Sequence, residues 1–519
     1  MTFLTKQKLT FTAFAVVLLS AIGIGMAFMR DADFTVPLRS MASHLTRGEY
    51  ARFKGESFFS SLLAMFGVDG ANANAEETEN SVPVLLYHGI VVSNDRFSIT
   101  PGSFKEQMYT LKRAGYQTIT LDDFYAFQRG EKKLPKRSFL LTFDDGRRDS
   151  FEGADPVLEA LGFKAVMFMP AAETVPDPKW LSSYYLGLKD IKKMIASGRW
   201  MIGSHAVQKN GGFVPISPTE KGNFLSNKSW LPDQDRLETD EEYRARITHE
   251  ITDSKRGLES EFHVTVDAMS FPFGDYGQQT VNHPEARAAV AEITGQTYRI
   301  AFRQVWQHDG DFIMNHASDP RLALKRVETP TSWSGERLVQ YLEGGIEKPL
   351  TFTDDFTNDA GWRTTWGASD LNDARLTMAA KETSGASVFL DGTRLWKDYT
   401  FRTTFDWSSG TNVSLMARYK NGKNYLSCTF GEGNVSISNT VNGETVRIQT
   451  VKNASPIAAG GETSLGMNVR GNTATCYSGA TPVVMATVPD TDGGIGIRIW
   501  DPNRDVAKAQ FKSVEVTPL

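Results

Sequence analysis

Two adjacent carboxylates at the end of an apolar run are the residues whose type and spacing point most clearly to chemistry. The run Ser138–Phe143 is typical of a strand buried on both faces, and Asp144, Asp145 and Gly146 follow it directly. Two acids at the tip of a buried strand are costly unless they bind a cation or handle a proton. An ordinary strand end followed by an Asp-Gly turn is the alternative interpretation of this tripeptide alone.

Two other segments place a histidine at the end of a predicted strand. The run Val84–Tyr87 leads into His88, and a Gly-Ser pair precedes His205. Strands and helices alternate from residue 82 to residue 343 at βα spacing, which predicts a parallel sheet or a barrel. In such folds the chemistry lies at the carboxyl ends of the strands. We therefore expect both histidines and both acids to face one site.

The hydrophobic pattern also predicts the elements that position these residues. The predicted strands are Val84–His88, Tyr116–Leu121, Ser138–Phe143, Lys164–Met169, Ala268–Phe271, Tyr298–Phe302 and Leu322–Val327. The predicted helices are Phe104–Ala114, Asp122–Gln128, Pro156–Leu161, Glu241–Phe262 capped by Asp240, Glu285–Ile293 and Ser334–Leu342. The polar stretch Ala206–Thr239 is too long for a plain connection, so we expect it to be ordered and close to the site.

Beyond residue 348 helical periodicity disappears and short alternating segments take over. Asn-Gly pairs at 421–422 and 442–443 predict tight hairpins. We therefore predict an antiparallel β-sandwich over residues 349–519. Its two cysteines, Cys428 and Cys476, are the only ones in the chain, and a bridge between them requires a compartment outside the cytosol.

The N-terminal residues predict export. Leu9–Met29 carries no charge, is long enough to span a bilayer, and follows two lysines that favour an N-terminus inside. A retained membrane anchor over residues 1–30 is the preferred interpretation, and a cleaved signal peptide is the alternative. Residues 31–81 read as a stalk and linker. Both alternatives place the body of the protein outside the cytoplasm, at the cell membrane or secreted.

The bulk numbers exclude some classes of partner. The chain has 519 residues and a net charge of −5, and no dense basic run favours nucleic acid as a partner. Two cysteines rule out a cysteine-rich metal cluster.

Four segments, in this order, resemble the polysaccharide deacetylases of carbohydrate esterase family four. They are Pro83–His88, Thr142–Gly146, Gly203–His205 and Phe271–Asp275. Residues 223–247 resemble the branch that deacetylates poly-β-1,6-N-acetylglucosamine. The resemblance implies a distorted (β/α) barrel over residues 82–348, an N-acetylglucosamine polymer as the substrate and a divalent metal ion, usually zinc.

The resemblance also implies roles. Asp144 is the general base, while Asp145 and His205 are metal ligands. The backbone N–H of Phe273 is the oxyanion donor. The remaining matched residues, expected on the substrate side, are His88, Pro272 and Asp275.

The sequence departs from the family pattern at the second metal histidine. Lys209 and Asn210 occupy the positions where the family carries it, and Asn210 is the candidate for a replacement oxygen ligand. The general acid is expected to be a histidine near the last barrel strands, with His316 the first candidate and His308 the second.

The C-terminal sandwich resembles the concanavalin-like and laminin-G-like jelly-roll modules, which often bind carbohydrate. Trp362, Trp366, Trp396, Trp407 and Trp500 are the tryptophans that could form a sugar-stacking face, but tryptophans in a sandwich more often lie in the core, which is the preferred interpretation.

Three functions remain open from the sequence. The first is hydrolysis of N-acetyl groups from an extracellular glycan, among poly-N-acetylglucosamine, peptidoglycan and chitin-like chains. The second is a weakened deacetylase-like protein that binds cell-surface glycan. The third is an envelope assembly factor that uses the sandwich for protein contacts.

Overall fold

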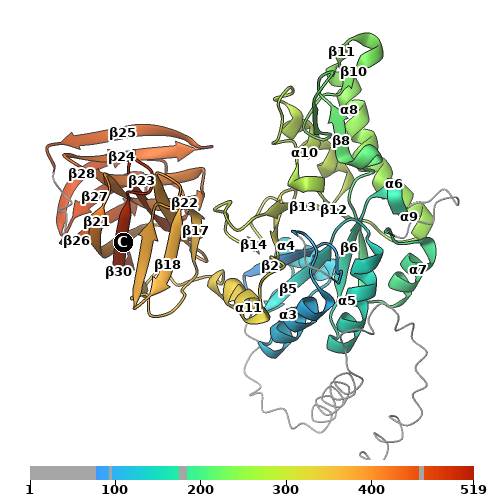
Figure 1. The fold of residues 1–519 in the computed structure, drawn as a ribbon, viewed down its shortest axis with the longest axis horizontal. Helices are drawn as coiled ribbons and strands as arrows, with labels where there is room; N and C mark the ends of the chain where they lie inside the picture. The colour runs from blue at the N-terminus through green and yellow to red at the C-terminus, as the bar shows by residue number, and fades with distance from the viewer. Residues whose placement is uncertain (1–77, 93–95, 175–183, 455–460) are drawn as a thin grey trace, which may run out of the picture.

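The computed structural model describes residues 78–519 except 93–95, 175–183 and 455–460 (Figure 1). Its first half is built on a closed barrel of seven parallel strands, which confirms the predicted barrel. Around the barrel the order is β2 (Ser81–Tyr87), β15 (Leu324–Glu328), β13 (Ile300–Val305), β12 (Ala268–Ser270), β7 (Trp200–Ser204), β6 (Ala165–Met169) and β5 (Ser138–Phe143), which pairs with β2 again. Closure leaves no strand of the barrel with an unpaired edge.

Helices surround the barrel and bury their apolar sides against its strands, except α4, whose Phe124 packs with inward-facing strand residues such as Val84 and Leu140 (Figure 1). They are α3 (Pro101–Arg113), α4 (Leu121–Gln128), α5 (Arg148–Leu161), α7 (Leu188–Ala196), α8 (Asp240–Thr248), α9 (Ser254–Phe262), α10 (Ala286–Thr297) and α11 (Gly335–Gly344). Because all seven strands run the same way, the residues that follow them gather at one end of the barrel.

The predicted helix over residues 241–262 is two helices joined by a π turn, His249–Asp253. Its predicted cap at Asp240 is wrong by one residue. The Thr239 hydroxyl accepts from the Glu242 amide, and the Glu242 carboxylate accepts from the Thr239 amide. This reciprocal capping box satisfies two amides that the first helical turn leaves open.

As predicted, the backbone of the stretch 206–239 is ordered. It forms two short hairpins, β8 (Phe213–Pro215) with β9 (Lys221–Asn223) and β10 (Trp230–Leu231) with β11 (Arg236–Leu237). The Arg246 guanidinium on α8 donates to the carbonyl oxygens of Phe224 and Asn227 and to the Glu238 carboxylate. These bonds fix the insertion against the barrel.

The second half contains two antiparallel sheets that enclose one hydrophobic core. The seven-stranded sheet has the order β17 (Trp362–Trp366), β20 (Gly385–Leu390), β29 (Gly494–Trp500), β22 (Asn412–Asn421), β23 (Asn424–Gly431), β24 (Asn434–Val441) and β25 (Glu444–Lys452). The eight-stranded sheet has β18 (Ala368–Asn372), β19 (Arg375–Ala379), β30 (Lys508–Pro518), β21 (Tyr399–Ser409), β26 (Glu462–Arg470), β27 (Thr473–Ser478) and β28 (Thr481–Thr487), with β16 (Phe352–Asp354) beside β30. The predicted all-β region and both Asn-Gly hairpins are confirmed.

A disulfide joins Cys428 on β23 to Cys476 on β27, and so links the two sheets. Three of the five tryptophans offered for sugar stacking are instead buried in the core, namely Trp362, Trp396 and Trp407. Large aromatic side chains supply most apolar area when they lie between two sheets, which explains their burial. Trp366 and Trp500 remain partly exposed.

The barrel and the sandwich form two lobes joined through α11 (Figure 1). The Phe312 ring packs edge-on against Phe389 and Tyr419, at centroid distances of 5.4 Å and 6.0 Å. The Tyr419 hydroxyl donates to the carbonyl oxygen of Gly310 at 2.9 Å.

Among the described residues, none of the helices combines the length and apolar character needed to cross a bilayer. The predicted anchor, Leu9–Met29, and the stalk over residues 31–77 lie outside the described residues.

Candidate active site

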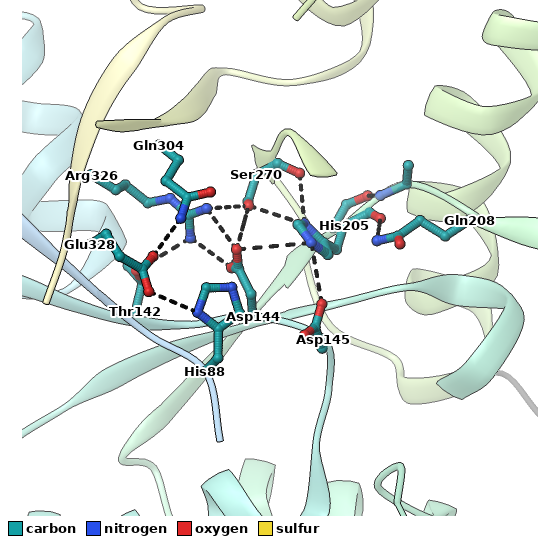
Figure 2. A network of polar contacts seen from close by, with 12 residues as sticks. His88, Thr142, Asp144, Asp145, His205, Gln208, Ser270, Gln304, Arg326 and Glu328 are labelled. Atoms are coloured by element: carbon teal, nitrogen blue, oxygen red, sulfur yellow. Dashed lines mark hydrogen bonds and ion pairs between the residues drawn. The ribbon is translucent and has the colours of Figure 1, made fainter. Parts of the chain in front are cut away.

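Asp144 follows β5 and lies buried at the carboxyl end of the barrel (Figure 2). Arg326 on β15 holds both its carboxylate oxygens, with Nη1–Oδ1 at 2.6 Å and Nη2–Oδ2 at 2.7 Å. The Ser270 hydroxyl lies 3.3 Å from each oxygen and accepts from Arg326 Nη2 at 2.6 Å. A bidentate, fully buried guanidinium fixes both the position and the charge of the acid.

Burial alone would raise the pKa of Asp144. The Arg326 charge and its hydrogen bonds, together with His205 and His88, outweigh burial and hold the pKa of this carboxyl well below its usual range. Asp144 is therefore ionised at neutral pH.

Asp145 takes a left-handed backbone conformation, with φ of 70°. Aspartate tolerates this conformation better than most residues, and Gly146 continues it with φ of 60°. The turn brings the Asp145 carboxylate to the same side as Asp144 (Figure 2). About a third of the Asp145 side chain is open to solvent, at 34% exposure, whereas Asp144 is at 4%.

His205 follows β7 and joins the two acids. Its Nδ1 lies 2.9 Å from the carbonyl oxygen of Ser270, and its Nε2 lies 3.6 Å from Asp145 and 3.9 Å from Asp144. If Nδ1 carries the proton toward that carbonyl, the Nε2 lone pair faces the acids. The structure thus brings together Asp144, Asp145 and His205, as the sequence predicts.

Asp145 and His205 are donors of the kind that a divalent cation takes, and they fall one short of the three usual at a catalytic zinc. Within the described part of the chain no cluster of three His, Cys, Asp or Glu side chains could hold a metal ion. The third predicted ligand, Asn210, and its neighbour Lys209 have side chains that lie outside the described residues, so their place in the site stays a prediction.

His88 lies on the other side of Asp144 (Figure 2). Its Nδ1 forms an ion pair with Glu328 at 3.4 Å, and Gln304 donates to the second Glu328 oxygen at 2.5 Å. Burial works against the imidazolium, but Glu328, with Asp144 and Asp145, raises the pKa of His88 to about 9. His88 is therefore protonated at neutral pH beside an ionised acid, and its contact with a substrate stays a prediction.

His316 is wrong as the general acid. It lies on β14 (Met314–His316), which runs antiparallel to β2 and places His316 opposite Ser81, at the amino end of that strand. The site follows the carboxyl end of β2, roughly 20 Å away at about 3.3 Å per residue. The second candidate, His308, is exposed, and its Nδ1 lies 3.2 Å from the Thr364 carbonyl oxygen of the sandwich.

The Phe271–Asp275 segment supplies a turn at the site, and two of its residues do not face a substrate. Pro272 is buried, and Asp275 is fully buried with one oxygen accepting from Ser226 and from the Gly277 amide. Asp275 therefore anchors the insertion to the turn. Phe273 has φ of 58° and a ring 47% exposed at the barrel mouth.

The sequence pattern missed Arg326, Ser270 and Glu328. The available signal was the placement of an arginine and a glutamate two residues apart in a predicted buried strand. Side chains two apart on a strand share a face, and buried charges need partners.

The sequence model of the polysaccharide deacetylase family matches residues 131–293. The poly-beta-1,6-N-acetyl-D-glucosamine N-deacetylase of Escherichia coli K12 is 25% identical over 212 residues, which are 38% of this chain and 31% of that protein. The enzyme of the same name from Staphylococcus aureus MRSA252 is 22% identical over 237 residues, 41% of this chain and 74% of that protein. This chain thus spans about a third of the length of the E. coli relative.

A solved de-N-acetylase from Aggregatibacter actinomycetemcomitans superposes with a TM-score of 0.43 and 18% identity, over 50% of this chain and 98% of that one. The family match over residues 131–293 covers β5, β6, β7 and β12, and so includes Asp144, Asp145 and His205. The barrel is therefore similar in sequence to the polysaccharide deacetylase family over the strands that carry these three residues.

Proposed function

We propose that this protein hydrolyses N-acetyl groups from an extracellular polysaccharide that contains N-acetylglucosamine, releasing acetate. The observation that carries the proposal is the buried, ionised Asp144 beside the Asp145–His205 pair at the open end of the barrel. An ionised carboxylate can take a proton from water, and the neighbouring pair lies where the acetamide would meet that water.

Asp144 is the general base in this proposal. Arg326 occupies one direction of each carboxylate oxygen and leaves lone pairs for a water molecule. Water loses a proton to Asp144 and attacks the acetyl carbon, and the carbonyl oxygen becomes an oxyanion. Arg326 keeps Asp144 charged at the expense of basicity, since a lower pKa makes a weaker base.

His88 is the proton donor to the departing nitrogen. Its Nδ1 faces Glu328, so the other ring nitrogen faces Asp144 and the site (Figure 2). When the carbon–nitrogen bond breaks, the amine takes that proton, and acetate leaves as the second product. Glu328 and Gln304 hold the ring in the orientation that this transfer requires.

A divalent metal ion, zinc by preference, would be held by Asp145 and His205. Bound there, it would polarise the acetyl carbonyl and lower the pKa of a water molecule. The Phe273 amide is proposed as the second stabiliser of the oxyanion.

Exposed aromatic side chains around the barrel mouth favour a polymer as the substrate. Within the described residues, every exposed aromatic side chain follows a barrel strand: Phe97, Tyr184, Phe213, Phe273 and Trp306. Phe97 packs against His88 and Trp306, while Phe213 packs against Phe273 at 4.8 Å. Aromatic faces on both sides of the acids suit pyranose rings on both sides of the acetamide.

The disulfide supports a location outside the cytoplasm, since such bonds persist in oxidising compartments. Anchoring by residues 9–29 stays a prediction.

The second candidate function is a deacetylase-like protein that binds glycan with little turnover. The observation that favours it is the pair of metal donors where three are usual. Zinc retained after dialysis, with affinity increased by Asn210→His, would favour the enzyme with an altered site over this alternative.

The deciding experiment measures acetate release from an N-acetylglucosamine oligomer with added zinc or cobalt. We expect release by the wild-type chain and a fall of about 1000-fold in Asp144→Asn, because general-base catalysis contributes about 10²–10⁴-fold. Glu343→Gln, at an exposed ion pair with Arg137, is the matched control and should retain activity. Equal rates in wild type and Asp144→Asn would overturn the proposal.

A further inference from the structure

The outer face of the seven-stranded sheet is hollowed and lined by hydroxyl groups. On β22, β23 and β24 the alternate residues Leu415, Cys428 and Ile437 point into the sandwich core. The residues between them line the hollow, with a floor of Ser414, Ser427, Ser436 and Ser438. We name this hollow the sheet groove. Its walls are formed by Tyr425, Trp500, Arg447 and Arg498.

The floor of the sheet groove has unused hydrogen-bonding capacity. Ser436 is 3% exposed, lines the groove, and has no side-chain hydrogen bond to any residue that the structure describes. Among the described residues, the Ser414 and Thr429 hydroxyls bond only to each other, at 2.9 Å, so each retains further hydrogen-bonding capacity. Buried hydroxyls are costly without partners, so a ligand rich in hydroxyl and amide groups complements this floor.

Aromatic rings border the same hollow. Trp500 and Tyr425 line it, and the Arg498 guanidinium lies 5.0 Å over the Trp366 ring and 3.4 Å from the Tyr425 hydroxyl. Partly exposed tryptophan and tyrosine beside a polar floor match a pyranose, which has an apolar face and a polar edge.

The charge of the groove is one-sided. Arg447 and Arg498 line it, and no carboxylate from the part of the chain that the structure describes does. An adjoining hollow shares Tyr425 and Thr440, but its cations Arg418 and Lys420 are paired with Asp490 and Asp492, at 3.8 Å and 3.7 Å, so among the described residues the unpaired positive charge is that of Arg447 and Arg498. A chain that carries ammonium groups is therefore repelled, whereas a neutral chain is not.

The groove lies on the same sheet face that contacts the barrel. Phe389 and Tyr419, on that face, pack against Phe312 of the connection 306–313. This connection begins at Trp306, one of the exposed aromatic residues of the barrel mouth. One short segment therefore joins the groove face to the mouth.

We propose that the sheet groove binds a stretch of N-acetylated glycan chain and disfavours the same chain once deacetylated. The chemistry is amide and hydroxyl recognition by the serine floor, ring stacking on Trp500, and repulsion of ammonium groups by Arg447 and Arg498. This inference rests on the proposed function for the identity of the chain, and it adds a reason for product release. Each acetyl group removed converts a neutral sugar into a cation that the groove repels.

The test measures binding of two probes to the full chain carrying Asp144→Asn, which prevents turnover. The probes are a β-1,6-linked N-acetylglucosamine hexamer and the same hexamer fully deacetylated, at a pH that protonates its amines. We expect the acetylated hexamer to bind at least about threefold more tightly, the effect of one ammonium within roughly 7 Å of a guanidinium in a water-like medium.

Arg447→Glu, on the exposed edge strand β25, should tighten binding of the deacetylated hexamer and remove the preference. Trp500→Ala should weaken binding of the acetylated hexamer about tenfold. Arg470→Glu, exposed on the eight-stranded sheet, is the charge-matched control and should change neither affinity. Unchanged affinities in both groove variants would overturn the inference.

The outcomes also separate this inference from the proposed activity. Acetate release by a chain whose groove variants bind normally would leave the activity standing and the groove assignment wrong. If binding depends on the groove residues but the chain releases no acetate, the groove assignment stands and the proposed activity is wrong.

Discussion

Two buried clusters of charged residues share strand β15 of the barrel and have different roles. Lys325 and Arg326 are neighbours on β15, and their side chains point to opposite sides. Arg326 faces inward to Asp144 at the carboxyl end of the barrel. Lys325 faces outward to Asp319, which also pairs with Arg394 of the sandwich.

Each cluster contains a histidine, and their pKa values shift in opposite directions. Burial, together with the like positive charges of Lys325 and Arg394, lowers the pKa of His316 to about 4. His88 has Glu328 as its partner, and its pKa rises to about 9 in spite of burial. The difference shows that the cluster at the joint of the two lobes holds its histidine neutral beside a fully paired acid, whereas the cluster at the mouth keeps a charged donor and a charged acceptor side by side.

The acids of the two clusters also differ in how far they are exposed to solvent. Asp319 has a cation on each oxygen and a side chain 5% exposed. Beside Asp144, Asp145 is 34% exposed, and its one ion-pair partner within the described residues is the His205 ring, with Nε2 at 3.6 Å. A cluster that is saturated stabilises the fold, and one that is left open can bind a ligand.

The largest expected effect comes from exchanging the two neighbouring cations for methionine. Arg326→Met leaves Asp144 buried without its partner, so we expect a loss of about 3–5 kcal/mol in the free energy of unfolding and at least about a 100-fold fall in acetate release. Lys325→Met leaves Asp319 paired with Arg394, so acetate release should stay within about twofold. Thermal unfolding and acetate release of both variants check this.

Equal losses of activity in the two methionine variants would contradict the division between the clusters.

The next effect compares the two histidines. His88→Gln removes the proposed proton donor, so acetate release should fall about 100-fold while the amide keeps much of the side-chain volume. His316→Gln should change acetate release less than about twofold and lower the melting temperature by a few degrees, because His316 lies in the joint between the lobes. If His316→Gln lost activity without a change in melting temperature, His316 would return as the general acid.

The gathering of Asp144, Asp145 and His205 could be predicted because each residue directly follows a strand, and parallel strands bring their carboxyl ends together. The direction of the chain between β13 and β15 could not be predicted from the sequence. Residues 314–316 form a three-residue strand that runs against its neighbour, and so a histidine expected at the mouth lies at the opposite end. Nothing in three residues of local pattern shows which way they run.

Contacts between residues far apart in the sequence could not be predicted either. Arg326 and Asp144 are 182 residues apart, and their contact depends on β15 and β5 both flanking β2. For the tryptophans the local pattern left core and surface open, and the packing of two sheets decided it. Trp362, Trp396 and Trp407 are enclosed, whereas Trp366 and Trp500 border the groove.

The smallest expected effect is a shift in pH dependence, and it tests the mouth cluster most directly. His88 donates a proton only while it is protonated, so the rate should fall as pH rises through about 9. Glu328→Gln removes the carboxylate that raises this pKa. The alkaline fall should therefore move to lower pH, with the rate at low pH less affected.

The stability of the fold should change with pH in the same direction as the rate. A histidine whose pKa is raised on folding contributes stability that is fully present below its unfolded pKa of about 6.5, and that is lost as pH rises through about 9. Wild type should therefore lose stability between about pH 6.5 and 9, and Glu328→Gln should lose less over the same interval. Lys325→Met is the control, since it leaves the Glu328–His88 pair intact and should keep the alkaline fall at the wild-type pH. An alkaline fall at the same pH in wild type and Glu328→Gln would show that a group other than His88 donates the proton.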